Sequence, residues 1–170
     1  MQKFKFCPKC AAKLDVRTLH GRNRLMCSSC GFILYQNPKP TVGVFIVENK
    51  KILLAKRALE PFKGWWDSIG GFMEEGETPQ ETAIREAKEE TGLDIKLIEI
   101  LGVGKDIYQS QDLLHIVPIS FIAKISGGKI KAADDVAELK WFPLVNLPEK
   151  ISFKGNKIAL KLVKKRHHID

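Results

Sequence analysis

The sequence predicts an α/β protein that carries a small cysteine-rich module before its main domain. Strand-like segments stand before and after one helical segment, and a second helical segment comes near the end of the chain. All four cysteines precede residues 36–40, a connector that contains two prolines and separates segments of different composition. We therefore expect a metal-binding module at residues 1–36 and an α/β domain at residues 37–170.

Several segments of the main domain have the apolar residues and bounding turns that are typical of strands. They cover residues 41–47, 51–57, 94–101, 113–125 and 136–142. Near the end of the chain, the apolar spacing of residues 156–165 predicts a helix.

The best-defined helix is expected at residues 79–90. Thr78 can cap its start, Pro79 suits the first helical position, and Glu81 completes a capping box. Gly92 stands where helices commonly end in a left-handed conformation. One arc of this helix is expected to press onto a sheet through its small or apolar residues, Ala83, Ile84 and Ala87.

Three carboxylates share another face of this helix, because Glu86, Glu89 and Glu90 follow an i, i+3, i+4 pattern. Like charges at this spacing repel one another, so the pattern indicates divalent cations that neutralise them. Oxygen ligands favour Mg²⁺ or Mn²⁺ over zinc. The alternative is a solvated acidic face. The fixed sequence spacing between these glutamates and Glu77, Arg85 and the flanking glycines disfavours it.

Residues 71–93 resemble the signature of the Nudix hydrolase family. That signature reads Gly-x5-Glu-x7-Arg-Glu-U-x-Glu-Glu-x-Gly-U, with U apolar, and all nine fixed or restricted positions match over 23 residues. Ala87 and Leu93 fill the two apolar positions. The resemblance implies an α/β/α sandwich with a mixed sheet. It also implies hydrolysis of a nucleoside diphosphate linked to another group, usually with Mg²⁺.

The resemblance assigns roles to the residues of the signature. The three helix glutamates would hold the metal ions together with the backbone carbonyl of Gly70. Glu89 or Glu90 would also accept a proton from the attacking water. Arg85 and Glu77 would pair with each other and orient that face.

Three residues outside the signature are further candidates. In the family, an arginine placed like Arg57 often meets substrate phosphates; the alternative is an ordinary surface arginine. Trp65 could stack on a base, or it could pack its loop against the core. Glu138 resembles a family position that supplies an extra metal ligand or base, with three aspartates as rivals, Asp112, Asp134 and Asp135.

Two C-x2-C pairs, separated by 16 residues, are formed by Cys7 with Cys10 and by Cys27 with Cys30. This spacing is typical of a zinc ribbon, in which four thiolates complete a tetrahedron. Two disulfides or a redox C-x-x-C are the alternatives, but nothing suggests export and neither pair has a thioredoxin-like setting. We expect a structural zinc, because four thiolates leave no open coordination position.

The net charge of +8 is distributed unevenly along the 170 residues. Residues 1–40 hold eight basic and one acidic side chains, residues 41–148 hold 13 and 17, and residues 149–170 hold seven and two. Both basic ends could attract polyanions. The basic and aromatic residues of the ribbon could bind nucleic acid, or they could be solvated and cover its own turns.

The chain has no run of 18 apolar residues, and its Lys-rich start lacks the apolar core of a signal peptide. The sequence therefore predicts a soluble, cytoplasmic protein with no membrane partner. Nudix domains often pair, which makes a homodimer one expectation.

A zinc ribbon before a Nudix domain resembles the NADH pyrophosphatase subgroup. That subgroup carries Ser-Gln-Pro-Trp-Pro-Phe-Pro-x-Ser after the signature, whereas this chain reads Ser110-Gln111 and then Asp112-Leu113. The architecture favours dinucleotide cleavage and the motif does not. Another nucleoside diphosphate sugar and an oxidised or ordinary nucleoside triphosphate stay open, with ADP-ribose or NADH as the leading substrates. The alternatives are an RNA-binding or nucleotide-sensing regulatory protein and a hydrolase of capped RNA.

Overall fold

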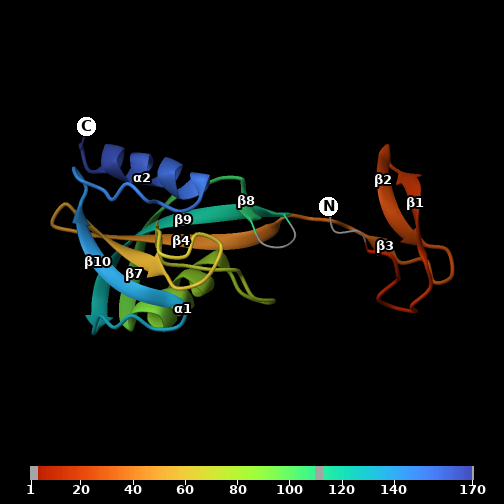
Figure 1. Cartoon of the computed structure of the whole chain (residues 1–170), viewed down its shortest axis with the longest axis horizontal. Helices are drawn as coiled ribbons and strands as arrows, with labels where there is room; N and C mark the ends of the chain where they lie inside the picture. The colour runs from red at the N-terminus through yellow and green to blue at the C-terminus, as the bar shows by residue number, and fades with distance from the viewer. Residues whose placement is uncertain (1–3, 110–112, 170) are drawn as a thin grey trace. The chain divides into compact units, whose positions relative to one another are not determined.

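The computed structural model describes residues 4–109 and 113–169 and is shown in Figure 1. The chain divides into two compact units, Met1–Asn37 and Pro38–Asp170. Each unit has its own sheet.

The first unit is a three-stranded antiparallel sheet with two similar turns. Its strands pair in the order β1 (Leu14–Leu19), β2 (Arg22–Cys27) and β3 (Ile33–Leu34). Each C-x2-C pair closes a turn in which the residue after the second cysteine has positive φ, 59° at Ala11 and 73° at Gly31. The amide of that residue donates to the carbonyl of the first cysteine, over 2.9 Å at Ala11 and 3.0 Å at Gly31.

The second unit is built on a seven-stranded mixed sheet whose main path runs β10-β5-β4-β9-β7. Strand β4 is parallel to β9, and the other pairs are antiparallel. Two short strands extend it, because β6 pairs with β5 and β8 pairs with β9. The strands are β4 (Lys39–Glu48), β5 (Lys51–Arg57), β6 (Trp66–Asp67), β7 (Leu93–Val103), β8 (Asp106–Gln109), β9 (Leu113–Gly128) and β10 (Val136–Pro143).

Helices α1 (Pro79–Thr91) and α2 (Lys154–Arg166) cover opposite faces of this sheet, as Figure 1 shows. The alternation along β4 explains the two layers. Val44 and Ile46 belong to the core beneath α1, whereas Phe45 and Val47 belong to the core beneath α2. The expected α/β/α sandwich with a mixed sheet is therefore confirmed.

Helix α1 begins at Pro79 as expected and ends one residue later than expected, at Thr91. Its capping box joins Thr78 and Glu81, and Gly92 ends it with φ of 69°. Ala83 and Ala87 are buried against the sheet. Ile84 is 48% exposed, so the expectation that it packs on the sheet is wrong. It is one position past Ala83, and this turns its side chain off the buried arc.

All five expected strands and the second helix are present, most of them extended by one or more residues. The short strands β6 and β8 and the three ribbon strands were not expected from the sequence. Among the described residues, the helices are too short or too polar to cross a membrane.

Candidate active site

Of the three signature carboxylates on α1, two lie buried between the helix and the turn at Gly70 and Gly71. Glu86 is 8% exposed and Glu90 is 6% exposed. The amide of Gly70 donates to Glu90 Oε2 over 2.9 Å. A side chain at Gly71 would place its Cβ 2.5 Å from Glu86 Oε1, which explains the glycine there. The turn and the carboxylates therefore form one tightly fitted site.

Arg85 is the cation at the centre of this acidic face. Its Nε and Nη2 donate to the two carboxylate oxygens of Glu77 over 2.6 and 2.9 Å. Its Nη1 donates to Glu86 Oε1 over 2.7 Å and to Glu89 Oε2 over 3.0 Å. The side chain of Glu89 is 49% exposed, so it faces solvent beside its two buried neighbours. One guanidinium thus orients three carboxylates.

Burial raises the pKa of Glu90 well above its ordinary value, and it also raises the pKa of Glu86. Arg85 opposes the change at Glu86, and the Gly70 amide opposes it at Glu90. The negative charge of Asp135 raises both pKa values further. A buried group of carboxylates that repel one another is the donor set that a hard divalent cation stabilises.

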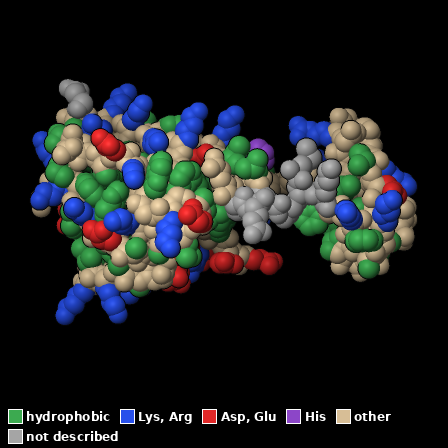
Figure 2. Space-filling view, viewed as in Figure 1, with side chains coloured by type: hydrophobic (Ala, Val, Ile, Leu, Met, Phe, Trp, Pro, Cys, Tyr) green, Lys and Arg blue, Asp and Glu red, His purple; other side chains and the backbone are tan. Residues whose placement is uncertain are grey.

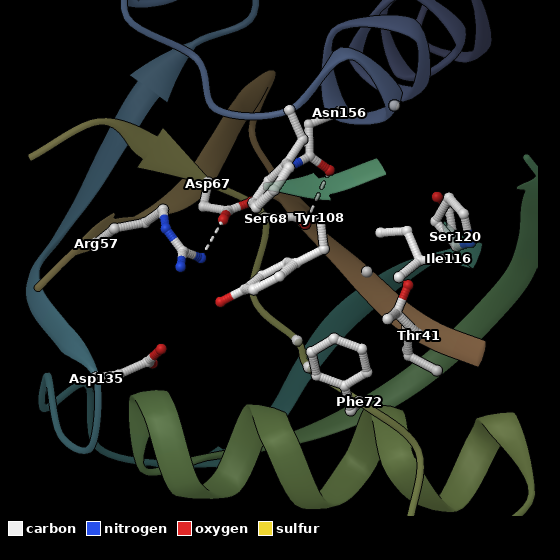
Figure 3. A pocket seen from close by; sticks show the side chains of 17 residues that line it. Thr41, Arg57, Asp67, Ser68, Phe72, Tyr108, Ile116, Ser120, Asp135 and Asn156 are labelled. Atoms are coloured by element: carbon white, nitrogen blue, oxygen red, sulfur yellow. Dashed lines mark hydrogen bonds and ion pairs between the residues drawn. The ribbon is translucent and has the colours of Figure 1, made fainter. Parts of the chain in front are cut away.

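A cavity of about 140 Å³ opens beside Gly70 and Gly71 and is shown in Figure 3. Three aromatic rings stand in its wall. Phe72 and Tyr108 meet edge to face with centroids 5.4 Å apart. Tyr108 and Phe153 stack with centroids 5.6 Å apart and planes 20° apart. An aromatic wall of this kind suits a flat ring such as a nucleobase.

A hydrogen-bonded network forms the polar side of the cavity. Arg57 Nη1 lies 2.9 Å from Asp67 Oδ2, and Arg57 Nε donates to the carbonyl of Pro61 over 2.6 Å. The amide of Asn156 donates to Asp67, and its oxygen accepts from Ser68 over 3.1 Å. Burial raises the pKa of Asp67, and the Arg57 charge opposes that change. The network fixes Arg57 in the cavity wall.

The remaining candidates are divided between the cavity and the surface. Arg57 and Asp135 line the cavity. Trp65 is absent from its lining; the ring packs on Phe62, with centroids 5.3 Å apart. Glu138 is also absent from the lining, and its carboxylate pairs with the Lys56 ammonium at 3.2 Å. The contacts of Trp65 therefore match packing within its loop and not stacking on a base in this cavity.

Other residues of the sequence analysis lie away from the cavity or outside the described part. Asp134 is exposed, with φ of 55°, and does not line the cavity. Asp112 and the Ser110-Gln111 pair fall outside the described residues. Sequence reasoning missed several lining residues, because they come from three different segments and no spacing connects them, among them Asp67, Tyr108, Phe153 and Asn156.

The four cysteines of the first unit come together with free thiols. Their sulfur atoms all lie within 4.8 Å of one another. Cys7 and Cys30 have sulfurs 3.6 Å apart, and Cys10 and Cys27 have sulfurs 3.5 Å apart. Four thiolates about 2.3 Å from a zinc ion stand about 3.8 Å from each other. The cluster therefore fits a structural tetrahedral zinc, and two disulfides do not describe it.

Family models match both units of the chain. One described as the NUDIX domain matches residues 37–162, and one described as Nudix N-terminal, a zinc ribbon, matches residues 5–36. A NUDIX hydrolase of Nitrosomonas europaea has a similar crystal structure, with a TM-score of 0.83 and 30% identity. The match covers 98% of this chain and 94% of that one.

Two groups of relatives resemble this chain in sequence. An ADP-ribose pyrophosphatase of Methanocaldococcus jannaschii is 45% identical over 128 residues, covering 74% of this chain and 73% of the relative. The NAD-capped RNA hydrolase NudC of Vibrio atlanticus is 30% identical over 149 residues, covering 87% of this chain. The chain spans about half the length of that second relative, 52%. With the signature, the fold and both family models in agreement, the chain belongs to the Nudix hydrolase family and carries that family's N-terminal zinc ribbon.

Proposed function

We propose that this protein uses Mg²⁺ or Mn²⁺ to hydrolyse the pyrophosphate bond of nucleoside diphosphate-linked compounds, with ADP-ribose as the leading substrate and NADH as the next. The observation that carries the proposal is the position of the buried Glu86 and Glu90 beside an aromatic-lined cavity. A diphosphate held at the carboxylates would leave its nucleoside within reach of that cavity. The similarity to an ADP-ribose pyrophosphatase supports the same substrate.

The carboxylates of α1 divide into ligands and positioning groups in this proposal. Glu86, Glu89 and Glu90 hold the cations together with the carbonyl of Gly70. When bound, the cations neutralise the diphosphate and lower the pKa of the attacking water. Glu89 is the more exposed of the two candidate bases, and it can reach a water molecule from solvent. Arg85 holds the carboxylates in register and keeps them from repelling one another.

The cavity supplies recognition in this proposal. The rings of Tyr108 and Phe153 offer a stacking surface for the base, a role that Trp65 does not share. Arg57 remains the candidate for a substrate phosphate, because it lines the cavity with its orientation fixed by Asp67. Asp135 is the better candidate than Glu138 for an extra carboxylate, since its charge acts on Glu86 and Glu90.

A hydrolysis panel tests the proposal. It contains ADP-ribose, NADH, nucleotide sugars, and ordinary and oxidised nucleoside triphosphates, each with Mg²⁺ or Mn²⁺. Glu90→Gln should lower turnover of the best substrate at least about a hundredfold, because it removes a charge from the metal-binding face. The exposed Glu149→Gln is the matched control and should keep wild-type turnover. Hydrolysis unaffected by Glu90→Gln would refute the assigned site.

Capped RNA is a second candidate substrate, and the relatives described as NAD-capped RNA hydrolases favour it. The ribbon adds a suitable surface, because the Arg24 guanidinium lies 4.5 Å from the centroid of the exposed Tyr35 ring. Including NAD-capped RNA in the panel tests this substrate directly. Replacing the basic ribbon residues Lys3, Lys5, Arg22 and Arg24 should weaken RNA binding if the ribbon takes part.

We also propose that the protein works in the cytoplasm. Four free thiols arranged to hold a metal fit a reducing compartment better than an oxidising one. Recovery of zinc-loaded, disulfide-free protein from the cytoplasmic fraction of its cells would support this location.

A further inference from the structure

One face of helix α2 is a continuous row of lysines. Of its 13 residues six are basic and none is acidic. Ala159, Leu160 and Val163 are buried on the sheet. The exposed lysines recur every three or four residues and so share one side of the helix. We call this row the lysine face, formed by Lys154, Lys157, Lys161 and Lys165.

Within the described part of the chain, no ion pair joins the four lysines of this row to a carboxylate. The ion pair formed by α2 there joins Arg166 to Glu99 at 3.5 Å, and it leaves the lysine face unpaired. No residue of the first turn of α2, where Lys154 and Lys157 lie, is acidic. The carboxylate of Asp106, from β8, accepts a hydrogen bond from the Gly155 amide there and leaves the lysines unpaired. Cations are unfavourable at that end because the helix dipole is positive there. The two lysines at the start of α2 are therefore not placed there by the needs of the helix, and the unpaired row suits an external anion.

The lysine face starts beside the cavity. Phe153, Gly155 and Asn156, at the start of α2, all line it. The Lys157 ammonium lies 5.9 Å from the centroid of the Trp65 ring. From Lys154 to Lys165 the row extends about 16 Å along the helix, at 1.5 Å per residue. Figure 2 shows Lys and Arg side chains along the edge where Figure 1 places α2.

A small nucleotide cannot use such a row, because its phosphates remain at the carboxylates of α1. A polyanion that begins in the cavity and continues outward can contact several lysines in turn. Their steps of three or four residues, about 4.5 to 6 Å, are comparable with the separation of successive phosphates in an extended single strand. A membrane surface is the competing partner, since Ile158 and Leu162 are also exposed on α2.

We propose that the lysine face of α2 binds the phosphate backbone of a single-stranded RNA whose 5′-terminal nucleotide occupies the cavity. The start of the row at a cavity suited to a nucleotide favours RNA over a membrane. The placement of the 5′-terminal nucleotide in the cavity rests on the proposed function, whereas the role of the lysine face concerns RNA binding alone. It assigns RNA contacts to the catalytic unit, in addition to any contacts that the ribbon makes.

Binding of a short, 5′-NAD-capped, single-stranded RNA tests the inference. Fluorescence anisotropy follows the titration in the presence of Mg²⁺. The full-length protein carries Glu90→Gln, so that it does not cleave the RNA during the measurement. The test variant adds Lys154→Gln, Lys157→Gln, Lys161→Gln and Lys165→Gln. The control adds the same charge change at exposed lysines near the end of α1 and on β7 and β9, Lys96→Gln, Lys124→Gln, Lys129→Gln and Lys131→Gln.

The salt dependence of binding is measured as the slope of log K against log [salt]. Loss of four phosphate contacts should make this slope less steep by about 3, because each phosphate of a single strand contributes about 0.7. The same loss weakens binding about a hundredfold or more near 0.1 M salt. The control should keep the wild-type slope and affinity. The inference is overturned if test and control variants bind RNA alike. Loss of binding to phosphatidylserine vesicles with RNA binding unchanged would overturn it too, in favour of a membrane.

The same lysine substitutions, placed in protein with Glu90 intact, separate this inference from the proposed function. ADP-ribose hydrolysis should stay at the wild-type rate, because the free substrate does not reach along α2. Failure of the wild-type protein to hydrolyse ADP-ribose would refute that substrate without affecting the RNA-binding result. A parallel loss of ADP-ribose turnover in the lysine variant would show that the lysine face takes part in binding the small substrate. It would refute a separate RNA-binding role for this face.

Discussion

Glu77 shows how a single residue orders the acidic face of α1. Arg85 holds both of its carboxylate oxygens, and the Glu74 amide and the Thr82 hydroxyl donate to it over 2.9 and 2.8 Å. The hydrogen bonds from Arg85, followed by those from Glu74 and Thr82, lower the pKa of Glu77 to about 2. Because that pKa lies below its ordinary value of 4.5, the stabilisation is complete above about pH 4.5 and disappears as pH falls toward 2.

Replacing Glu77 with Gln should therefore change the acid sensitivity of the fold. The free energy of unfolding of the wild type should decrease from pH 4.5 to pH 2 by more than that of Glu77→Gln, because the variant cannot take up this proton. Urea unfolding at several pH values measures the difference. At neutral pH the variant should also lose about tenfold or more in turnover, since Arg85 loses its anchor. Equal pH slopes would contradict this account of Glu77.

Asp135 and Glu138 offer a direct comparison between two carboxylates. Asp135 lines the cavity and raises the pKa of Glu86 and Glu90, whereas Glu138 pairs with Lys56 on the surface of β10. We expect Asp135→Asn to lower kcat by at least about tenfold, because it removes charge next to the proposed metal-binding face. Glu138→Gln should stay within about twofold of wild type. Steady-state kinetics that reversed this order would restore the assignment to Glu138.

How far the sequence could predict the site depends on where its residues lie along the chain. A stretch of 14 residues holds Glu77, Arg85 and the helix glutamates, so their fixed spacing on one helix and the loop before it was enough to relate them. Arg57, Asp67 and Asn156 come together from β5, β6 and α2. Their contact depends on strand pairing and helix placement, which no local pattern contains.

At the scale of elements, α1 is the one whose ends the sequence predicted best. Its start is coded by the hydrogen bonds between Thr78 and Glu81 and its end by the glycine conformation at Gly92. Both signals are local chemistry and need no tertiary partner. The strands β6 and β8 have two and four residues and exist only through pairing with β5 and β9. That dependence is why the sequence did not predict them.

The capping box provides a test of this local coding. Thr78→Ala removes the hydroxyl that accepts from the Glu81 amide over 3.3 Å. We expect the free energy of unfolding to fall by about 1 kcal/mol, as at other N-caps. Urea denaturation of Thr78→Ala, Glu81→Ala and the double variant measures the coupling between the two residues. Additive effects would show that the reciprocal box does not act as a unit.

At the scale of the molecule, the two units differ in what stabilises them. The second unit has two apolar cores, one on each face of its sheet. Among its described residues, the first unit has three buried core residues, Cys7, Leu14 and Cys27, and two of these are metal-ligand candidates. A segment of this size cannot bury enough apolar surface to fold by itself. Its folding free energy must come largely from zinc binding.

Zinc removal should therefore unfold the first unit and leave the second folded. A zinc-selective chelator, or Cys27→Ser, should abolish the amide exchange protection of β1 and β2 while the main thermal transition of residues 38–170 is retained. ADP-ribose turnover with Mg²⁺ should continue, because the carboxylate face and the cavity are made of residues from the second unit. Hydrogen exchange with mass spectrometry follows both units in one sample. Protection in β1 that survived chelation would mean that the ribbon folds without its metal, and the four-thiolate assignment would then have to be abandoned.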